Sequence, residues 1–205
     1  MNRRPQRSVT GTDTEVRDED WYARELRGER HERVAFVDVD MTEVLTESSV
    51  FDGCTFRGVR FNASRHVESA FLNCTFRSCT FFDTSFTRCK MVGSTFDRCT
   101  FSSLDAVGGD WSFVGLAGAD LRKVRFDGTR MREADLTDVR AEGTSLREVD
   151  LTSAWLHGAD LSRADLRGAQ LATIDPSTVT LTGAVIGPEQ AVAIAEALGL
   201  EVRLD

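Results

Sequence analysis

The sequence predicts an all-β fold, a β-helix in which the chain turns after every short strand. Two observations point to it: a large apolar residue recurs at every fifth position, and a small residue stands two positions before it. A period of five matches neither the roughly 3.6 residues of a helical turn nor the alternation of a flat strand, so no ordinary amphipathic element explains it. A repeat of fixed length decides the whole fold.

The register of large residues runs without insertion or deletion through most of the chain. It begins at Phe36, Met41, Phe51 and Phe56, passes through Phe81, Phe101, Leu121, Leu146 and Leu171, and ends at Ile186. The small residues that precede them include Val34, Cys54, Cys74, Thr84, Ser94, Ala134 and Ala164. Both sets are expected to point inward, while the positions between them face water.

The motifs CTFRS, STFDR, GADLR and RADLR resemble the pentapeptide-repeat family, whose consensus is A(D/N)LXX with variants that carry Phe at the centre. This resemblance implies a right-handed quadrilateral β-helix with four repeats in each coil. We expect residues 34–187 to form the β-helix. Residues 1–33 are expected to be a partly disordered N-terminal extension with a possible capping turn, and residues 188–205 a C-terminal helix and strand used for dimerisation.

Composition limits the partners. The net charge of −8 argues against nucleic acid as a direct ligand, because phosphate binding needs clustered Lys and Arg, and it favours a basic protein partner. The charged N-terminus and the lack of a stretch of roughly 18 apolar residues predict a cytoplasmic protein without membrane contact.

The cysteines and histidines are predicted to be structural. All five cysteines fall at the small inward position, where stacked side chains would make strained disulfides, so free, buried and inert thiols are expected at Cys54, Cys74, Cys79, Cys89 and Cys99. Thr46, His66 and Ala106 under-fill one face, which predicts a bend or irregular stacking there. His66 is either a catalytic base or ligand, or a buried hydrogen-bonded histidine, and the absence of a second histidine nearby favours the latter. His31 and His157 are expected to be solvated.

The C-terminal segment predicts a helix that opens at Gly187-Pro188 and closes at Gly199. Its sequence AVAIAEAL is apolar on nearly every side, so one side can cap the last coil and the other needs a second molecule. An end-to-end homodimer is therefore expected. The contact residues would be Ala191, Val192, Ile194, Ala195, Leu198, Leu200 and Val202, with strand contacts extending to Leu204.

Further motifs resemble the MfpA and Qnr class of pentapeptide-repeat proteins: DEDW near the start, SAFLNCTF at residues 69–76, and QAVAIA near the end. The uninterrupted coils are closer to the MfpA type. This resemblance implies a dimeric rod that mimics DNA, binds DNA gyrase and protects it from quinolone-type poisons. The alternative is a scaffold that binds another basic protein.

The charge on the outward positions is consistent with mimicry. Residues 34–187 carry 21 acidic against 16 basic side chains. In the C-terminal half, one face has Asp135, Asp138 and Asp175 with no Lys or Arg, and the adjoining face adds Asp110, Glu133 and Asp150 beside Arg130 and Arg132. This acidic surface is either partner-binding or ordinarily solvated.

Outward apolar residues are a weaker candidate for a contact patch. Leu72 and Val92 lie outward in adjacent coils, and Phe82 is expected one face round.

The sequence shows no nucleophile with an oriented base, no phosphate-binding glycine loop and no ligand cluster, so no enzyme activity, cofactor, metal or small-molecule substrate is expected.

Overall fold

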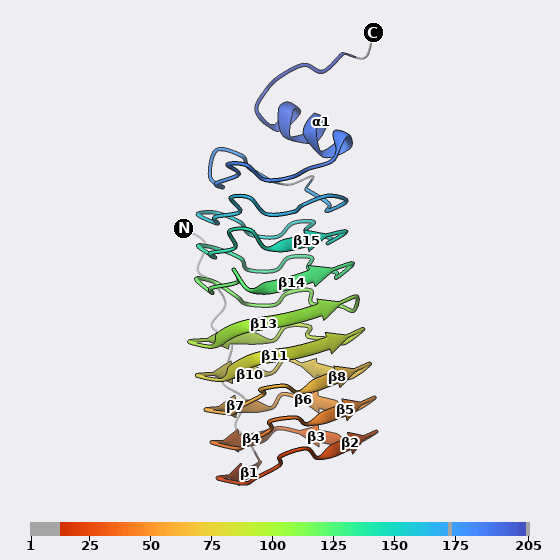
Figure 1. Ribbon diagram of the computed structural model, residues 1–205, viewed down its shortest axis with the longest axis vertical. Coiled ribbons are helices and arrows are strands. Elements are labelled where there is room, and N and C mark those ends of the chain that lie inside the picture. The colour runs from red at the N-terminus through yellow and green to blue at the C-terminus, as the bar shows by residue number, and fades with distance from the viewer. Residues whose placement is uncertain (1–12, 172–173, 204–205) are drawn as a thin grey trace.

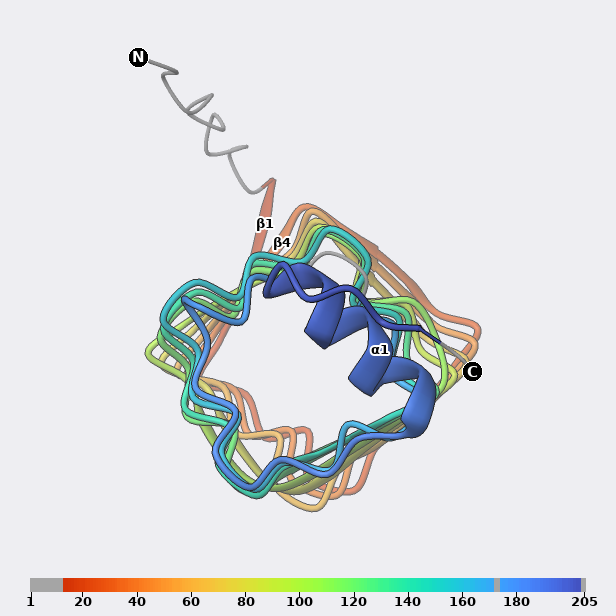
Figure 2. The same ribbon diagram turned by 90° about the horizontal axis from the view of Figure 1, so that it is seen from above.

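The period of five becomes a four-sided coil of twenty residues in the folded chain. The computed structural model describes residues 13–171 and 174–203. Residues twenty apart pair directly in parallel register, as Phe36 does with Phe56 and Phe56 with Phe76. Figure 1 shows the coils stacked in chain order, and Figure 2 shows their square outline from above. The expected right-handed quadrilateral β-helix is confirmed.

We number the four sides of the coil as faces 1 to 4, in the order in which the chain visits them. Face 1 carries β1 (Thr14–Arg17), β4 (Val34–Val37), β7 (Thr55–Arg57), β10 (Thr75–Arg77) and β12 (Thr95–Asp97). Face 3 carries β2 (Glu25–Arg27), β5 (Leu45–Glu47), β8 (Arg65–Val67), β11 (Thr80–Thr87), β13 (Thr100–Val107), β14 (Val124–Asp127) and β15 (Ser145–Arg147). Face 4 carries β3 (Arg30–Glu32), β6 (Val50–Asp52) and β9 (Ala70–Leu72). Face 2 is joined by isolated bridges such as Asp40 with Arg60, and β11 and β13 begin on it before turning onto face 3.

The core is built from stacks of identical side chains. On face 1 the rings of Phe36, Phe56 and Phe76 stack with centroids 5.0 and 4.8 Å apart, because parallel coils repeat at about the interstrand spacing. The small inward side chains satisfy the backbone of the coil below: the Cys74 thiol donates to the Phe51 carbonyl at 3.3 Å, and the Ser94 hydroxyl donates to the Phe71 carbonyl at 2.9 Å. Each inward position thus contributes to packing or to hydrogen bonding between coils.

The β-helix begins one coil earlier than the boundary at residue 34 that the sequence predicts. β1 pairs with β4, β2 with β5 and β3 with β6, all in parallel register. Trp21 and Leu26 are buried in this coil. The small residues that signal later coils are missing here because the first coil has none beneath it, so Glu19 and Arg24 lie exposed at the open end. Partial disorder is expected within residues 1–33, in about the first seventeen of them. Residues 14–17 form β1 instead, and residues 1–12 lie outside the described residues.

The sequence predicts a solvated His31, and this prediction is wrong. It keeps the register of five, and its ring stacks on Phe51 with centroids 4.9 Å apart. Only 20% of the side chain is exposed, and its Nε2 lies 3.2 Å from a carboxylate oxygen of Glu29. His31 therefore acts as the core residue of face 4 in the first coil.

The irregular stacking predicted on face 3 does not appear in the strand pairing. Parallel register runs from Thr46 to His66, Phe86, Ala106 and Phe126 without a break. Two causes explain the regularity. Thr46 and His66 are buried and within hydrogen-bonding distance of each other, and a bulky residue on the next face, Trp111, compensates for the small size of Ala106.

A single described helix, α1 (Pro188–Ala197), closes the C-terminal end and lies across the last coil (Figure 2). Gly187 is its N-cap and proline occupies its first turn, as predicted. Residues 200–203 form no strand, because the single chain offers them no neighbouring strand to pair with; Leu204 lies outside the described residues. Among described residues, no helix has the length and apolar character needed to cross a membrane.

Candidate partner-binding surface

The outward side of face 1 is acidic in its C-terminal half. A parallel bridge joins Asp135 directly to Trp155, one coil further on. The outward positions of this face between residues 115 and 178 hold Asp135, Asp138 and Asp175 and no Lys or Arg. The coil of twenty thus brings the three predicted aspartates onto one side of the rod.

Two of these aspartates also hold the backbone at a turn. A carboxylate oxygen of Asp135 accepts the backbone N–H of Thr137 at 3.1 Å. Asp175 accepts both the hydroxyl and the backbone N–H of Ser177, at 2.6 and 3.0 Å, and these bonds lower the pKa of its carboxyl. Asp138 is exposed and lies at a corner with φ of 55°. Substitution by alanine would therefore change backbone structure as well as charge at Asp135 and Asp175.

The acidic residues of the adjoining face 4 are largely paired. Arg130 Nη1 lies 3.1 Å from Asp110, and Arg132 Nε lies 2.6 Å from Asp150. Partial burial acts to raise the pKa of both aspartates, but hydrogen bonds from neighbouring hydroxyls and from these arginines lower it overall. Glu133 is exposed at the corner next to face 1. Of the six predicted residues, Asp110 and Asp150 thus contribute the least unpaired charge.

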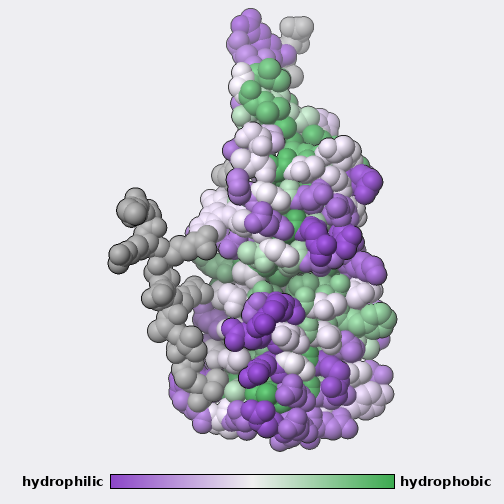
Figure 3. Space-filling view, turned by 90° about the vertical axis from the view of Figure 1, so that its left-hand side faces the viewer, coloured by the Kyte–Doolittle hydropathy of each residue, from purple (hydrophilic) through white to green (hydrophobic). Residues whose placement is uncertain are grey.

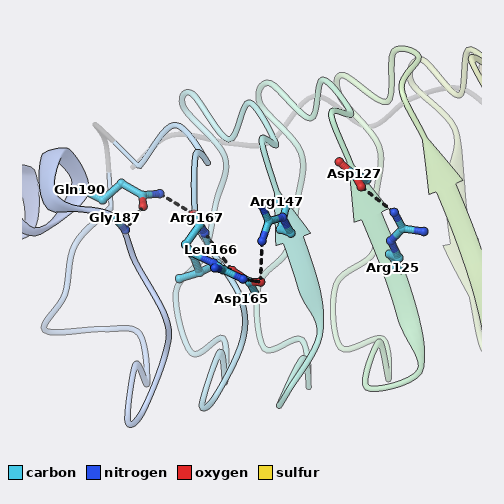
Figure 4. Close-up of polar contacts among 8 residues, drawn as sticks. All are labelled: Arg125, Asp127, Arg147, Asp165, Leu166, Arg167, Gly187 and Gln190. Atoms are coloured by element: carbon cyan, nitrogen blue, oxygen red, sulfur yellow. Dashed lines mark hydrogen bonds and ion pairs between the residues drawn. The ribbon is translucent and has the colours of Figure 1, made fainter.

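Two outward aspartates of face 3 are paired with arginines, unlike the three aspartates in the C-terminal half of face 1. Asp165 pairs with Arg147 at 3.3 Å and with Arg167 at 2.6 Å, as Figure 4 shows, and the Arg167 guanidinium holds the pKa of Asp165 well below its usual range. Asp127 pairs with Arg125 on the same face. Such exposed pairs add little stability, but they cancel the local field. Between residues 115 and 178, the outward positions of face 1 have no Lys or Arg to cancel the field of Asp135, Asp138 and Asp175 in this way.

Sequence reasoning missed Trp155, which lies on face 1 with 56% of its surface exposed. It stands one coil beyond Asp135 and one coil before Asp175. The signal was present, because counting in fives places this tryptophan at an outward position where other repeats carry short residues. Beside it is a pocket of about 300 Å³, floored by Leu156, Ile174 and Val179.

The outward apolar residues do not form the patch that the sequence suggests. Leu72 and Val92 lie in adjacent coils on face 4 and are partly buried. Phe82 is exposed, but it lies ten residues from Leu72 and hence two faces away, on the opposite side of the coil. The expectation that Phe82 lies one face round is wrong, because each face takes five residues.

The predicted dimerisation residues divide between the two sides of α1 and the segment after it. Ile194 packs against the core of the last coil, Ala191 is exposed, and Val192 and Ala195 are partly buried. Beyond the helix, Leu198 and Leu200 are 57% and 60% exposed, and Val202 is also exposed. Figure 3 shows apolar surface gathered at this C-terminal end. In the single chain, Leu198, Leu200 and Val202 are therefore exposed to solvent.

A buried glutamine that sequence reasoning did not single out fixes the helix to the rod. The side-chain oxygen of Gln190 accepts the Gly187 backbone N–H at 2.6 Å, and its amide group donates to the Leu166 carbonyl (Figure 4). The same amide group also donates to the Ala169 carbonyl at 2.8 Å. Glutamine three residues after the N-cap can accept the N-cap N–H, which is one of the two bonds of a capping box, and this spacing could have identified it. Gly187 has no side chain to make the second bond.

The inward titratable groups are packing elements. His66 is fully buried, with Thr46 Oγ1 2.9 Å from Nδ1 and Ser64 Oγ 3.0 Å from Nε2, and burial lowers its pKa to about 3. This confirms the prediction of a buried, hydrogen-bonded histidine. All five cysteines are free and four are buried, as predicted, with Cys99 partly exposed. Burial raises the pKa of Cys89 to about 11.

Comparison with known proteins agrees with this architecture. A model of the pentapeptide repeat region matches residues 79–156, and a model of eight pentapeptide repeats matches residues 144–172. The N-terminal half, residues 25–101, matches a model of the SV2A/B/C luminal domain. Two overlapping models of pentapeptide repeats thus match the chain from residue 79 to residue 172.

Two relatives make the class narrower. The chain is 41% identical over 93 residues to the pentapeptide repeat protein MfpA of Mycobacterium tuberculosis (strain ATCC 25618 / H37Rv), a match that covers 45% of this chain and about half, 51%, of that relative. A trypsin-treated form of QnrB1, a plasmid-mediated fluoroquinolone resistance protein, superposes with a TM-score of 0.59 at 18% identity, covering 95% of this chain and 99% of that one. The chain is thus similar in sequence to MfpA over about half its length, and it shares the fold of QnrB1.

Proposed function

We propose that this protein binds DNA gyrase as a mimic of DNA, modulating or inhibiting the enzyme and protecting it from quinolone-type poisons. The observation that carries the proposal is the unpaired acidic strip of Asp135, Asp138 and Asp175 on face 1. A convex rod with negative charge along one side suits a protein surface that normally binds the phosphates of duplex DNA. The 41% identity to MfpA over 93 residues supports the proposal, since the sequence motifs resemble the same class.

The proposed active form is a homodimer joined end to end through the C-terminus. Leu198, Leu200 and Val202 form an apolar set at the end of the rod that lies nearest to the acidic strip. A twofold axis through this end would bury that set and bring two acidic strips into line. Light scattering at micromolar protein tests the dimer, and a monomeric mass would contradict it.

The function is tested by DNA supercoiling with purified gyrase, with and without a fluoroquinolone. We expect inhibition by the wild-type protein, and loss of inhibition in the triple variant Asp135→Asn, Asp138→Asn, Asp175→Asn. Asparagine removes the charge but keeps an oxygen that can accept the turn N–H at Asp135 and Asp175.

The matched control is a second triple variant, Asp40→Asn, Asp120→Asn, Asp160→Asn, on face 2. These aspartates occupy the repeat position of Asp135 and Asp175 and accept the same kind of turn hydrogen bond. The corner residue Asp138 is matched only in charge, and both triple variants change the net charge by the same amount. The control should inhibit gyrase as the wild type does. Equal inhibition by both triple variants would remove face 1 from the mechanism. Failure of the wild-type protein to act on several gyrases would favour the alternative, a scaffold for another basic protein.

A further inference from the structure

Trp155 is much larger than the residues at the equivalent position of the preceding coils. The corresponding outward position on face 1 carries a short side chain in the five preceding coils: Thr55, Thr75, Thr95, Gly115 and Asp135. An indole that is 56% exposed at this point costs hydration free energy and adds nothing to the core. Trp155 lies within the acidic strip, between Asp135 and Asp175, so a partner could contact the exposed ring and the negative charge together.

The coil above Trp155 departs from the regular pairing and leaves room beside the ring. In preceding coils a corner N–H donates to the carbonyl nineteen residues on, as Asp138 does to His157 at 2.9 Å. The N–H of Gly158 donates instead to Thr178, twenty residues on, at 2.8 Å, and the regular bridge returns at Asp160 with Thr180. This shift accompanies the pocket of about 300 Å³ that lies between the two coils.

The pocket is lined by apolar side chains and by one carboxylate. Leu156, Ile174 and Val179 are buried, whereas Trp155, His157 and Asp175, which also line it, are exposed. The Asp175 carboxylate is exposed to solvent and is oriented by the Ser177 hydroxyl. A long aliphatic stem ending in a cationic group matches this lining, because the stem can lie on the floor while the charge meets the ring and the carboxylate.

We propose that this pocket, the Trp155 pocket, receives an arginine side chain of the protein partner, with the guanidinium stacked on the Trp155 ring and bonded to the Asp175 carboxylate. Arginine is preferred to lysine because a planar guanidinium can stack on an indole and bind a carboxylate at the same time. The chain already contains the stacking part of this arrangement: Arg24 Cζ lies 4.9 Å from the Trp21 ring centroid. Only the identity of the partner as gyrase rests on the proposed function.

The first test uses the purified protein and N-acetyl-arginine amide as the probe. Trp21 and Trp111 are buried, so the accessible tryptophan fluorescence reports on Trp155. We expect a saturable change with a dissociation constant of about a millimolar, as suits one side chain. The uncharged isostere N-acetyl-citrulline amide should give no saturable change, and N-acetyl-lysine amide a weaker one.

Three variants define the site. Trp155→Phe should abolish the fluorescence response, which assigns the signal. Asp175→Asn, which keeps the turn with Ser177, should weaken arginine amide binding several-fold, whereas Asp160→Asn, an equivalent turn residue on face 2, should bind as the wild type does. Equal responses to the arginine and citrulline amides, or undiminished binding by Asp175→Asn, would overturn the proposal.

The second test asks whether the partner uses the pocket. Trp155→Ala should weaken binding to immobilised gyrase by about tenfold, as expected for an aromatic contact at the centre of an interface. If gyrase binds the wild-type protein and this variant equally well, no partner arginine enters the pocket there and the inference is wrong. If wild-type protein does not bind gyrase but does bind arginine amide selectively, the proposed function fails while the Trp155 pocket stands.

Discussion

Ala106 and Trp111 occupy consecutive core positions of one coil, and the bulk of the second compensates for the small size of the first. Ala106 is paired with Phe86 below and Phe126 above. The Trp111 ring meets both phenylalanines edge-on, with centroids 5.5 and 5.4 Å apart. A ring from face 4 thus packs against the two rings that flank the alanine on face 3, which keeps the stack regular.

This complementarity predicts coupled effects on stability. Trp111→Leu should lower the free energy of unfolding by about 2–4 kcal/mol, because it removes a buried ring. Ala106→Leu in the wild-type background should cost about 1–3 kcal/mol by overpacking against Trp111. The double variant should lose at least about 1 kcal/mol less than the sum, as urea unfolding followed by circular dichroism would show.

Ala141→Leu is the matched control, since Ala141 is a buried core alanine on face 2 of a later coil. Its effect should add to that of Trp111→Leu. Additive losses for Ala106→Leu and Trp111→Leu would mean that the two side chains do not share space.

Burial of neutral His66 predicts a loss of stability as the pH falls. The pKa of His66 is about 3 in the folded chain against 6.5 for the unperturbed group, so the unfolded state binds the proton first. Stability is therefore fully present above the unfolded value and falls as the pH drops below it. From about pH 7.5 to pH 5.5 this histidine should reduce the free energy of unfolding by about 1.4 kcal/mol, measured by urea titration at each pH.

His66→Phe should remove that dependence, and His157→Gln, at an exposed position, should keep it. Carboxyl groups such as Asp120, whose pKa is lowered to about 2 by Arg122, lose their contribution at lower pH and do not interfere in this window. The same pH dependence in His66→Phe as in the wild type would assign the effect to other groups.

The structure also predicts which cysteine reacts first with a disulfide reagent. Cys99 is partly exposed, whereas Cys54, Cys74, Cys79 and Cys89 are buried. One fast equivalent per chain is expected in the native protein, followed by a slow phase that requires opening of the coils. Cys99→Ser should abolish the fast phase and Cys54→Ser should leave it intact; several fast equivalents would contradict the buried geometry of the remaining four.

The fold is predictable because the large and small residues that point inward repeat every five positions, so side-chain size alone identifies the inward positions. Counting in twenties is enough to place Asp135, Asp138 and Asp175 on one face. The start of the coil at Thr14 is not predictable from the small residues, since an end coil has no coil beneath it to fill. The register marks the place of the Trp155 pocket, because Pro176 stands where a large apolar residue is expected one coil after Leu156. The backbone shift at Gly158 leaves the spacing of the core residues unchanged, so the register does not reveal it.

Gln190 predicts that the C-terminal cap depends on one side chain. Gln190→Ala would leave the Leu166 and Ala169 carbonyls without their side-chain donor and the Gly187 N–H without its acceptor. Buried polar groups left unpaired cost about 1–3 kcal/mol each, so α1 should open locally by roughly 2–4 kcal/mol more readily. Hydrogen exchange should accelerate in residues 188–197 and stay unchanged in the coils from 36 to 151. Glu189→Ala, an exposed neighbour in the same turn, should exchange as the wild type does.

The proposed dimer uses the surface that α1 positions, so Gln190→Ala should also shift the mass measured by light scattering towards that of the monomer. A variant that exchanges faster yet stays dimeric would show that the dimer contact does not depend on the cap.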